Sequence, residues 1–336
     1  MQSIGRTARF DLLGIGNAII DVLAPVPAGF PEAQGMVPGS MTLIDAARAD
    51  AIYGMLSPEA QRGGGSVANS CVAAASLGAT VAYLGTVADD ALGRAFADDI
   101  RAAGIHFPCA PLAADRAEGR GTARCMILVT PDGQRTMNTY LGACTAFGTP
   151  DLDAAAIGDA RISYLEGYLF DPPAAQDAFR EAGRLAHAAG RAVALSLSDP
   201  FCVDRHRAAF LALAQGHVDI LFANQDEILS LYETDDFEEA AARAARTVEL
   251  AVLTRGPEGS VAFLRGERTE IAAASATVVD TTGAGDAYAA GFLFGLGRGL
   301  PVAECGRIAS VAAAEVIGHF GARPEADLRA LADLPG

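Results

Sequence analysis

Apolar residues along the chain fall into short β-branched runs that alternate with alanine-rich stretches of helical periodicity. The strand-like runs are Phe10–Gly16, Thr80–Val87, Ile162–Gly167, Ala192–Leu197, Val218–Ala223 and Leu250–Thr254. The helical patterns between them are Ser66–Leu77, Leu92–Ala103, Pro173–Ala189, Asp204–Ala214 and Phe237–Thr247, and the part after Gly283 is mainly helical. Strands that alternate with helices form βαβ units. The pattern therefore predicts an α/β fold in which helices cover both faces of a mostly parallel sheet.

Two segments interrupt this alternation and contain only β patterns. Residues 18–44 hold an apolar strand at Ile19–Val26, a passage rich in proline and glycine, and a strand at Ser40–Ile44. Residues 121–144 have the pattern of a hairpin, Thr122–Thr130 and Gln134–Leu141 around Pro131-Asp132-Gly133. We expect both segments to pair into a small sheet beside a main domain made of residues 1–17, 45–120 and 145–336. Placed over the carboxyl ends of parallel strands, where α/β proteins bind ligands, such a sheet is a candidate lid.

Composition limits the classes of partner. The 336 residues are 51% hydrophobic and 20% charged, which is enough for a large core, and the net charge of −16 argues against nucleic acid or an anionic membrane as the main partner. The six cysteines form no C-x-x-C pair, so we expect reduced thiols and neither a zinc site nor a disulfide framework. No signal-peptide pattern and no long apolar stretch occur, so a soluble, cytoplasmic protein is expected.

Residues 280–291, Asp-Thr-Thr-Gly-Ala-Gly-Asp-Ala-Tyr-Ala-Ala-Gly, carry the clearest chemical signal. We expect a strand that ends at Ala276–Val279, then a glycine turn and the start of a helix, whose unpaired N–H groups form an anion site. A carboxylate among those donors would repel a passive phosphate ligand, but it suits a group that accepts a proton. We therefore predict phosphoryl transfer to a hydroxyl, with Asp286 as the general base and the amides of Gly283, Ala284 and Gly285 stabilising the transferred group.

Other phosphate-binding patterns are excluded. A Walker loop needs Gly-Lys-Ser/Thr, and that triplet occurs nowhere in the chain. Gly14-Ile15-Gly16 begins like a dinucleotide fingerprint, but Ile19 stands at the third glycine and Asp21 follows too soon for a ribose-binding acid. The five histidines have no metal-ligand spacing.

The 280–286 motif resembles the C-terminal signature of the PfkB (ribokinase-like) family of sugar and nucleoside kinases. Gly64-Gly65-Ser66-Val67-Ala68-Asn69 resembles the N-terminal signature of that family, which holds substrate hydroxyls, and Gly85–Gly93 with Asp89-Asp90 resembles the passage that follows it. The resemblance spans about residues 10–325. It implies a three-layer ribokinase-like sandwich with a β lid, ATP as the phosphoryl donor and Mg²⁺ as a cofactor.

The resemblance also implies which residues bind the nucleotide, its phosphates and the ions. Asn224 and Glu227 match the Asn-x-x-Glu motif, which organises Mg²⁺ and phosphate through water, and Thr254, Gly256 and Gly259 match a nucleotide-binding turn. Thr282, with Gly283 and Gly285, would contact the nucleotide phosphates. Arg135 resembles a lid arginine that reaches the phosphates. Asp280 and Thr282 stand where family members bind a monovalent cation such as K⁺, with carbonyl groups near residues 316–322.

The spacing of Asn17 and Asp21 narrows the class of substrate that would accept the phosphoryl group. They are four residues apart, as in adenosine kinases, whereas ribokinases place the two residues two apart; Ser196–Phe201 and Val218–Asn224 also resemble bacterial adenosine kinases. The resemblance implies that Asn17 and Asp21 bind the substrate and that Asp21 binds the ribose hydroxyls. The remaining substrate contacts that we expect are Gly64, Gly65, Ser66, Asn69, Met41, Leu43, Met137 and Leu141.

The apolar members of this set suit an aromatic base. Met41 stands where animal-type adenosine kinases carry a glutamine, so inosine and guanosine stay open as substrates. The hypothesis is ATP-dependent phosphorylation of a nucleoside 5′-hydroxyl, with adenosine giving AMP in purine salvage. The alternatives are a sugar kinase of the same family, acting on ribose, fructose or a related sugar, and a non-catalytic nucleoside sensor. The expected partners are small molecules, and the protein would be a monomer or a homodimer.

Overall fold

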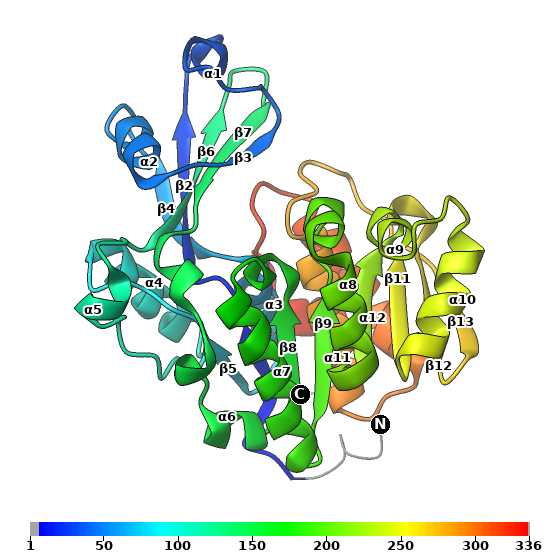
Figure 1. The fold of residues 1–336 in the computed structure, drawn as a ribbon. Helices are drawn as coiled ribbons and strands as arrows, with labels where there is room; N and C mark the ends of the chain where they lie inside the picture. The colour runs from blue at the N-terminus through cyan, green and yellow to red at the C-terminus, as the bar shows by residue number, and fades with distance from the viewer. Residues whose placement is uncertain (1–6, 335–336) are drawn as a thin grey trace.

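The computed structural model describes residues 7–334 and contains a large sheet and a smaller one (Figure 1). The large sheet has eight strands in the order β13-β12-β11-β10-β9-β8-β1-β5. Six of them are mutually parallel: β1 (Phe10–Ile15), β5 (Val81–Leu84), β8 (Ala160–Glu166), β9 (Ala192–Ser196), β10 (Ile220–Asn224) and β11 (Leu250–Thr254). Two antiparallel strands, β12 (Ser260–Leu264) and β13 (Glu267–Ile271), complete one edge. The predicted α/β fold around a mostly parallel sheet is confirmed.

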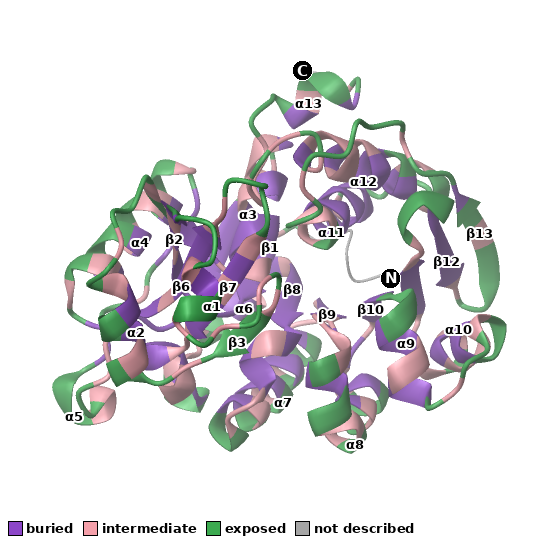
Figure 2. Ribbon diagram, turned by 90° about the horizontal axis from the view of Figure 1, so that it is seen from above, coloured by how far each residue is buried: buried purple, intermediate pink, exposed green. Residues whose placement is uncertain are grey.

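Helices cover both faces of this sheet because its central strands are apolar on both sides. In β9, Ala192 and Ala194 belong to one core and Val193 and Leu195 to the other. The first core packs against α3 (Ser66–Ser76), α11 (Ala284–Gly297) and α12 (Val302–Val316), and the second against α7 (Pro173–Ala188), α8 (Pro200–His217), α9 (Gln225–Tyr232) and α10 (Phe237–Thr247). Figure 2 shows the contrast with the edge strand β13, which is largely exposed. Its charged residues protect that edge from further pairing.

The small sheet has the order β3-β7-β6-β2-β4 and stands off the main body (Figure 1). It contains the four predicted strand regions, as β2 (Ile19–Pro25), β3 (Met41–Leu43), β6 (Ala123–Val129) and β7 (Arg135–Tyr140). It also contains β4 (Ala60–Gly64), which the hydrophobic pattern did not predict because its sequence is Ala-Gln-Arg-Gly-Gly. β4 runs into α3 through Gly65, so it connects the small sheet to the main body.

The remaining helices lie at the periphery. They are α1 (Phe30–Ala33), α2 (Ala46–Tyr53), α4 (Ala91–Ala102), α5 (Ala114–Ala117), α6 (Ala154–Gly158) and α13 (Leu328–Leu331). Across residues 7–334, none of the helices has the length and apolar composition that a membrane crossing requires. All six cysteines are free thiols.

The strand expected at Ala276–Val279 is wrong. The backbone between Ile271 and Asp280 is irregular, and Val278 is 61% exposed although its side chain is β-branched. The N–H groups of Val279 and Asp280 instead donate to the carbonyl oxygen of Ile317. The glycine turn is therefore entered from a loop that is held by the end of α12.

Candidate active site

The 280–286 motif forms the turn that begins α11. Gly283 is the N-cap residue with φ 79°, and a Cβ atom there would lie 2.6 Å from the backbone of Ala322. Only glycine satisfies both the left-handed backbone and this close approach. A Cβ atom at Gly285, by contrast, would meet no atom of residues 7–334 within 4 Å. The first amides of a helix have no intrahelical acceptor, so the open side of Gly285 leaves room for an anion at this helix start.

Asp286 lies in the first turn of α11 and contacts the first turns of α3. The hydroxyl of Ser66 donates to Asp286 Oδ1 at 2.6 Å, and Asn69 Nδ2 approaches Oδ2 at 3.5 Å. Burial raises the pKa of Asp286 to about 6, the two hydrogen bonds lower it, and the nearby charge of Asp21 raises it. A carboxylate with such a pKa is mostly ionised at pH 7 and is still basic enough to accept a proton from a hydroxyl.

Gly64 and Gly65 bring Asp21 to the start of α3. A Cβ atom at Gly64 would lie 2.3 Å from Asp21 Oδ2, and one at Gly65 would lie 2.3 Å from the carbonyl oxygen of Asn17. Gly65 also has φ 102°. The close approach of Asp21 to Gly64 and of Asn17 to Gly65 explains the glycine pair, and the pairing of β2 with β4 places Asp21 beside the helix that carries Ser66 and Asn69. Burial raises the pKa of Asp21 to about 6, and the charges of Arg323 and Arg135 lower it.

Strand register puts the predicted lid residues on one face of the small sheet. Asp21 pairs across β6 and β7 with Thr139 and Leu43, and two residues along these strands Met137 pairs with Met41. Arg135 follows two residues further along β7, so it shares this face, because alternate residues of a strand point the same way. Met41 and Leu43 are 44% and 48% exposed. The face therefore combines a carboxylate, a guanidinium and half-exposed apolar side chains.

Leu141 lies just beyond β7, at the start of a 3-10 turn. It lines a mainly apolar hollow of about 210 Å³ together with Leu43. A larger hollow of about 720 Å³ lies on the outer side of α7. Its arginines, Arg180 and Arg184, pair with acids of the same helix, so we assign it no ligand.

Sequence reasoning missed Glu166, a buried acid that organises the region behind the site. Asn17 Nδ2 donates to Glu166 Oε1 at 2.7 Å, and the N–H of Val67, at the start of α3, donates to Oε2 at 3.1 Å. Burial raises the pKa of Glu166 to about 7, and these hydrogen bonds lower it. The structure thus places the side chain of Asn17 against Glu166, and the expected contact between Asn17 and the substrate stays a prediction. The position of Glu166 at the carboxyl end of a buried parallel strand is the signal that would have identified it.

Arg135 reaches across from the small sheet to the 280–286 turn. Its Nη1 lies 2.6 Å from Asp280 Oδ2, and its guanidinium lies over the ring of Phe320. Asp280 Oδ2 also accepts from the N–H of Gly321, and Oδ1 accepts from the hydroxyl of Thr282. Burial raises the pKa of Asp280, but these hydrogen bonds and the charge of Arg135 outweigh it and lower the pKa below its usual value. Arg135 is therefore held beside the 280–286 turn.

Asn224 and Glu227 form a capping box at the start of α9. Asn224 Nδ2 donates to Glu227 Oε1, and the N–H of Glu227 donates to Asn224 Oδ1. Burial raises the pKa of Glu227 to about 7, the hydrogen bond from the backbone N–H of Asn224 to Oε2 lowers it, and Asp286 is among the acids whose charge raises it. Within residues 7–334, no three His, Cys, Asp or Glu side chains gather as a direct metal site. These residues fit Mg²⁺ that keeps its waters and is held mainly by substrate phosphates.

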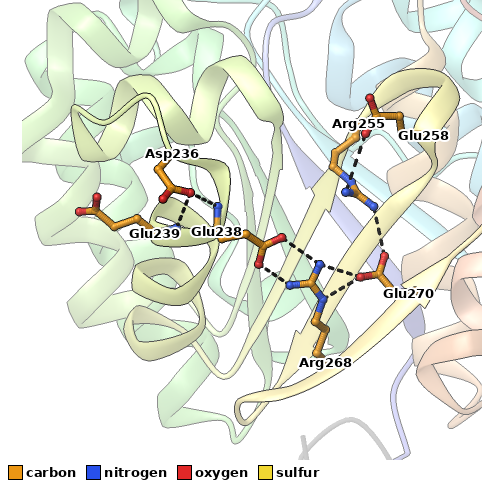
Figure 3. Close-up of polar contacts among 7 residues, drawn as sticks. All are labelled: Asp236, Glu238, Glu239, Arg255, Glu258, Arg268 and Glu270. Carbon is orange, nitrogen blue, oxygen red and sulfur yellow. Dashed lines mark hydrogen bonds and ion pairs between the residues drawn. The ribbon is translucent and has the colours of Figure 1, made fainter.

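The two predicted nucleotide motifs lie side by side, because Asn224 at the end of β10 pairs with Thr254 at the end of β11. The turn after Thr254 contains Gly256 and Gly259, both with positive φ. Figure 3 shows how this turn is held: Arg255 pairs with Glu258 and Glu270. In the same network Arg268 pairs with Glu238 and Glu270, which joins β13 to α10. These mostly exposed pairs set geometry more than they add stability.

Comparison with known proteins agrees with this arrangement. The model of the pfkB family of carbohydrate kinases matches residues 39–328. The adenosine kinase of Sinorhizobium meliloti is 49% identical, covers 97% of this chain and 99% of its own, and superposes with a TM-score of 0.88. A probable sugar kinase from Rhizobium etli is 45% identical over 97% and 98% of the two chains, with a TM-score of 0.89. The 5-dehydro-2-deoxygluconokinase of Shouchella clausii is 28% identical over 76% of this chain and 80% of its own. The chain therefore belongs to the PfkB family of carbohydrate kinases and is a phosphotransferase with an alcohol group as the acceptor.

Proposed function

We propose that the protein phosphorylates the 5′-hydroxyl of adenosine with ATP and releases AMP and ADP. The observation that carries this proposal is the face of the small sheet, on which Asp21 and the apolar side chains of Met41 and Met137 share one side. A carboxylate accepts hydrogen bonds from vicinal hydroxyls, and half-exposed apolar side chains suit an aromatic base. Phe201, 73% exposed on the first turn of α8, adds an aromatic surface at the ligand-binding edge of the large sheet.

Residues 18–44 and 121–144 would act as the lid over this site, together with β4. Asp21 would bind the ribose hydroxyls beside Gly64, Gly65, Ser66 and Asn69, which places the 5′-hydroxyl toward Asp286. Asp286 would accept the hydroxyl proton while the oxygen attacks the γ-phosphorus and ADP leaves. The amides at residues 283–286 and the guanidinium of Arg135 would stabilise the charge on the transferred group. Exclusion of water by the lid would prevent hydrolysis of ATP.

The nucleotide would lie along the ends of β10 and β11, against Asn224, Glu227 and the turn of Thr254, Gly256 and Gly259. Mg²⁺ bound with ATP would neutralise the β- and γ-phosphates, held through water near Asn224 and Glu227. A monovalent cation at Asp280 and Thr282 stays a prediction. Because Arg135 and three hydrogen-bond donors already engage the Asp280 carboxylate, a cation would have to take the place of Arg135.

A substrate panel tests the proposal. Purified protein is given ATP and Mg²⁺ with adenosine, inosine, guanosine, ribose or fructose, with and without K⁺, and the products are separated by chromatography. The expected result is the highest kcat/KM for adenosine, with AMP as the product. Turnover of a sugar with none of adenosine would overturn it in favour of a sugar kinase. Adenosine binding in calorimetry without release of ADP would overturn it in favour of a sensor.

A further inference from the structure

Arg323, in the loop between α12 and α13, connects parts of the molecule that are far apart in the sequence. Its Nε donates to Asn69 Oδ1 at 3.1 Å, and its Nη1 pairs with Asp99 Oδ2 of α4 at 2.6 Å. Its buried Nη2 has no hydrogen-bond partner among residues 7–334 and lies where a Cβ atom at Gly63 would come within 2.8 Å of it. No sequence pattern identified this residue. Its contacts reach the helix that faces Asp286, the strand at the root of the small sheet, and α4.

The bond to Asn69 decides which way that amide points. A guanidinium has only donors, so the group of Asn69 that faces Arg323 Nε must be its oxygen. Nδ2 is then on the other branch of the amide, where it approaches Asp286 Oδ2 at 3.5 Å. With the amide reversed, Nδ2 would face the donors of Arg323 and the oxygen would face the carboxylate of Asp286. Both contacts would be repulsive, so Arg323 and the Asp286 carboxylate favour the same orientation of the Asn69 amide, and the bond from Arg323 holds it there.

The charge of Arg323 acts on the second carboxylate of the site. Burial raises the pKa of Asp21 to about 6, and Arg323 is the largest influence that lowers it, ahead of Arg135. Without Arg323, Asp21 would therefore hold its proton to higher pH and would accept hydrogen bonds from substrate hydroxyls less well. Arg323 also follows Ala322, whose backbone packs against Gly283 at the start of α11.

We propose that Arg323 is a positioning residue for phosphoryl transfer, which orients Asn69 toward Asp286 and supplies the positive charge beside Asp21 without touching either substrate. The inference rests on the proposed roles of Asp286 and Asp21, but not on the identity of the base.

Two substitutions separate the two effects. Arg323→Met removes the donors and the charge, whereas Arg323→Lys keeps the charge and loses the planar Nε–H. Loss of a hydrogen bond that supports a charged group corresponds to a ~10–100-fold decrease in a rate constant. We expect Arg323→Met to lower kcat by this factor, to raise the KM for adenosine and to move the acid limb of the pH profile to higher pH. Arg323→Lys should lower kcat but leave the acid limb nearly in place.

Two controls remove ion pairs without touching Asn69. Arg307→Met removes another arginine that ties the C-terminal region, through Glu304 and the carbonyl oxygen of Ala332. Asp99→Asn breaks the ion pair of Arg323 while its guanidinium remains. Both controls should keep kcat within about threefold of the wild-type value and leave the acid limb of the pH profile in place. A change in the melting temperature does not alter this expectation. The inference would be overturned if Arg323→Met had the same kinetics and pH profile as these controls. If Arg323→Met does not fold, a wild-type kcat for Arg323→Lys would overturn it.

Failure of the Arg323 inference can be distinguished from failure of the proposed function. If the wild type phosphorylates a sugar and not adenosine, the same constants are measured with that sugar, and the adenosine proposal fails while Arg323 is still tested. If the wild type phosphorylates adenosine and the Arg323 variants match it, Arg323 fails alone. A crystal structure of Arg323→Met needs no turnover. Asn69 turned away from Asp286 is the expected result, and an unmoved Asn69 would overturn the inference.

Discussion

The loss of activity at acid pH should depend on the ionisation of two carboxylates, Asp286 and Asp21, rather than one. Burial raises the pKa values of Asp286 and Asp21 to about 6, and the charge of Asp21 also raises that of Asp286. Both groups must be ionised in the proposed reaction, Asp286 to accept a proton and Asp21 to accept hydrogen bonds. Protonation of either one stops the reaction, so activity is lost as the pH falls through about 6.

The magnitude follows from these values. A group with a pKa of 6 is about 90% ionised at pH 7 and about 9% ionised at pH 5. For two such groups the doubly ionised fraction falls from about 80% to below about 1%, so kcat/KM should fall ~100-fold, against ~10-fold for a single group. Asp21→Asn should therefore have a lower kcat/KM than the wild type at every pH. Below about pH 6 its kcat/KM should fall with half the slope of the wild type in a logarithmic plot against pH. The midpoint of this fall should lie at lower pH, because the charge that raised the pKa of Asp286 is gone.

The assay measures AMP by chromatography between pH 4.5 and 8, with ATP and Mg²⁺ saturating so that protonation of the nucleotide does not enter kcat/KM for adenosine. Circular dichroism at each pH confirms that the protein is folded. A wild-type limb with a slope of one that Asp21→Asn leaves unchanged would refute the requirement for two carboxylates. Activity that stays flat down to pH 5 would refute the raised pKa of Asp286 as well.

Four further outcomes follow from the same structure. Asp286→Asn should lower kcat by ~10²–10⁴ with little change in the KM for adenosine, and near-normal turnover would exclude Asp286 as the base. Arg135→Met should lower kcat by ~10²–10³, the usual effect of one lost donor to a transferred group; an unchanged kcat would place this arginine outside the reaction. Gly65→Ala should lower the free energy of unfolding by ~2 kcal/mol or more, measured with urea, because of its positive φ and the close carbonyl. In its control, Gly216→Ala in α8, the added Cβ atom meets no atom of residues 7–334 within 4 Å, so the change should be neutral or stabilising. The raised pKa of Glu166, about 7, means that the folded state holds an extra proton between pH 4.5 and 7, so the melting temperature should fall as the pH rises across this window, and a rise would contradict the burial argument.

The sequence predicted those parts of the site whose interactions are local. The Gly283–Asp286 turn and the Asn224/Glu227 pair each lie within a few residues, so the sequence identified them, but Ser66 and Asn69, which contact Asp286, are 220 and 217 residues away from it. The two-residue period of the strands also placed Met137 on the same face as Met41 once the register was known. The expected strand at Ala276–Val279 failed because its β-branched residues have no neighbouring strand and lie exposed on a loop.

The residues that were not predicted have distant partners. Glu166 binds Asn17 and Val67, which are 149 and 99 residues away, and Arg323 binds Asn69 from 254 residues away. No periodicity connects such positions, because only the tertiary fold brings them together. β4 was missed for a different reason: its glycines are required by the close approach of Asp21 to Gly64 and of Asp99 and Arg323 to Gly63, so the strand has few apolar side chains.

The parallel pairing of β2 with β6 has a consequence for synthesis of the chain. Ile19–Pro25 pairs along its whole length with Ala123–Val129, so the first strand of the small sheet must wait for a partner that leaves the ribosome roughly a hundred residues later. At about 5–20 residues per second this delay is ~5–20 s. Until then β4 can cover only one edge of this apolar strand, so its other edge is available to other nascent chains. Slower growth at low temperature, or chaperone binding to residues 19–25, should therefore raise the yield of folded enzyme more than any change to the finished active site.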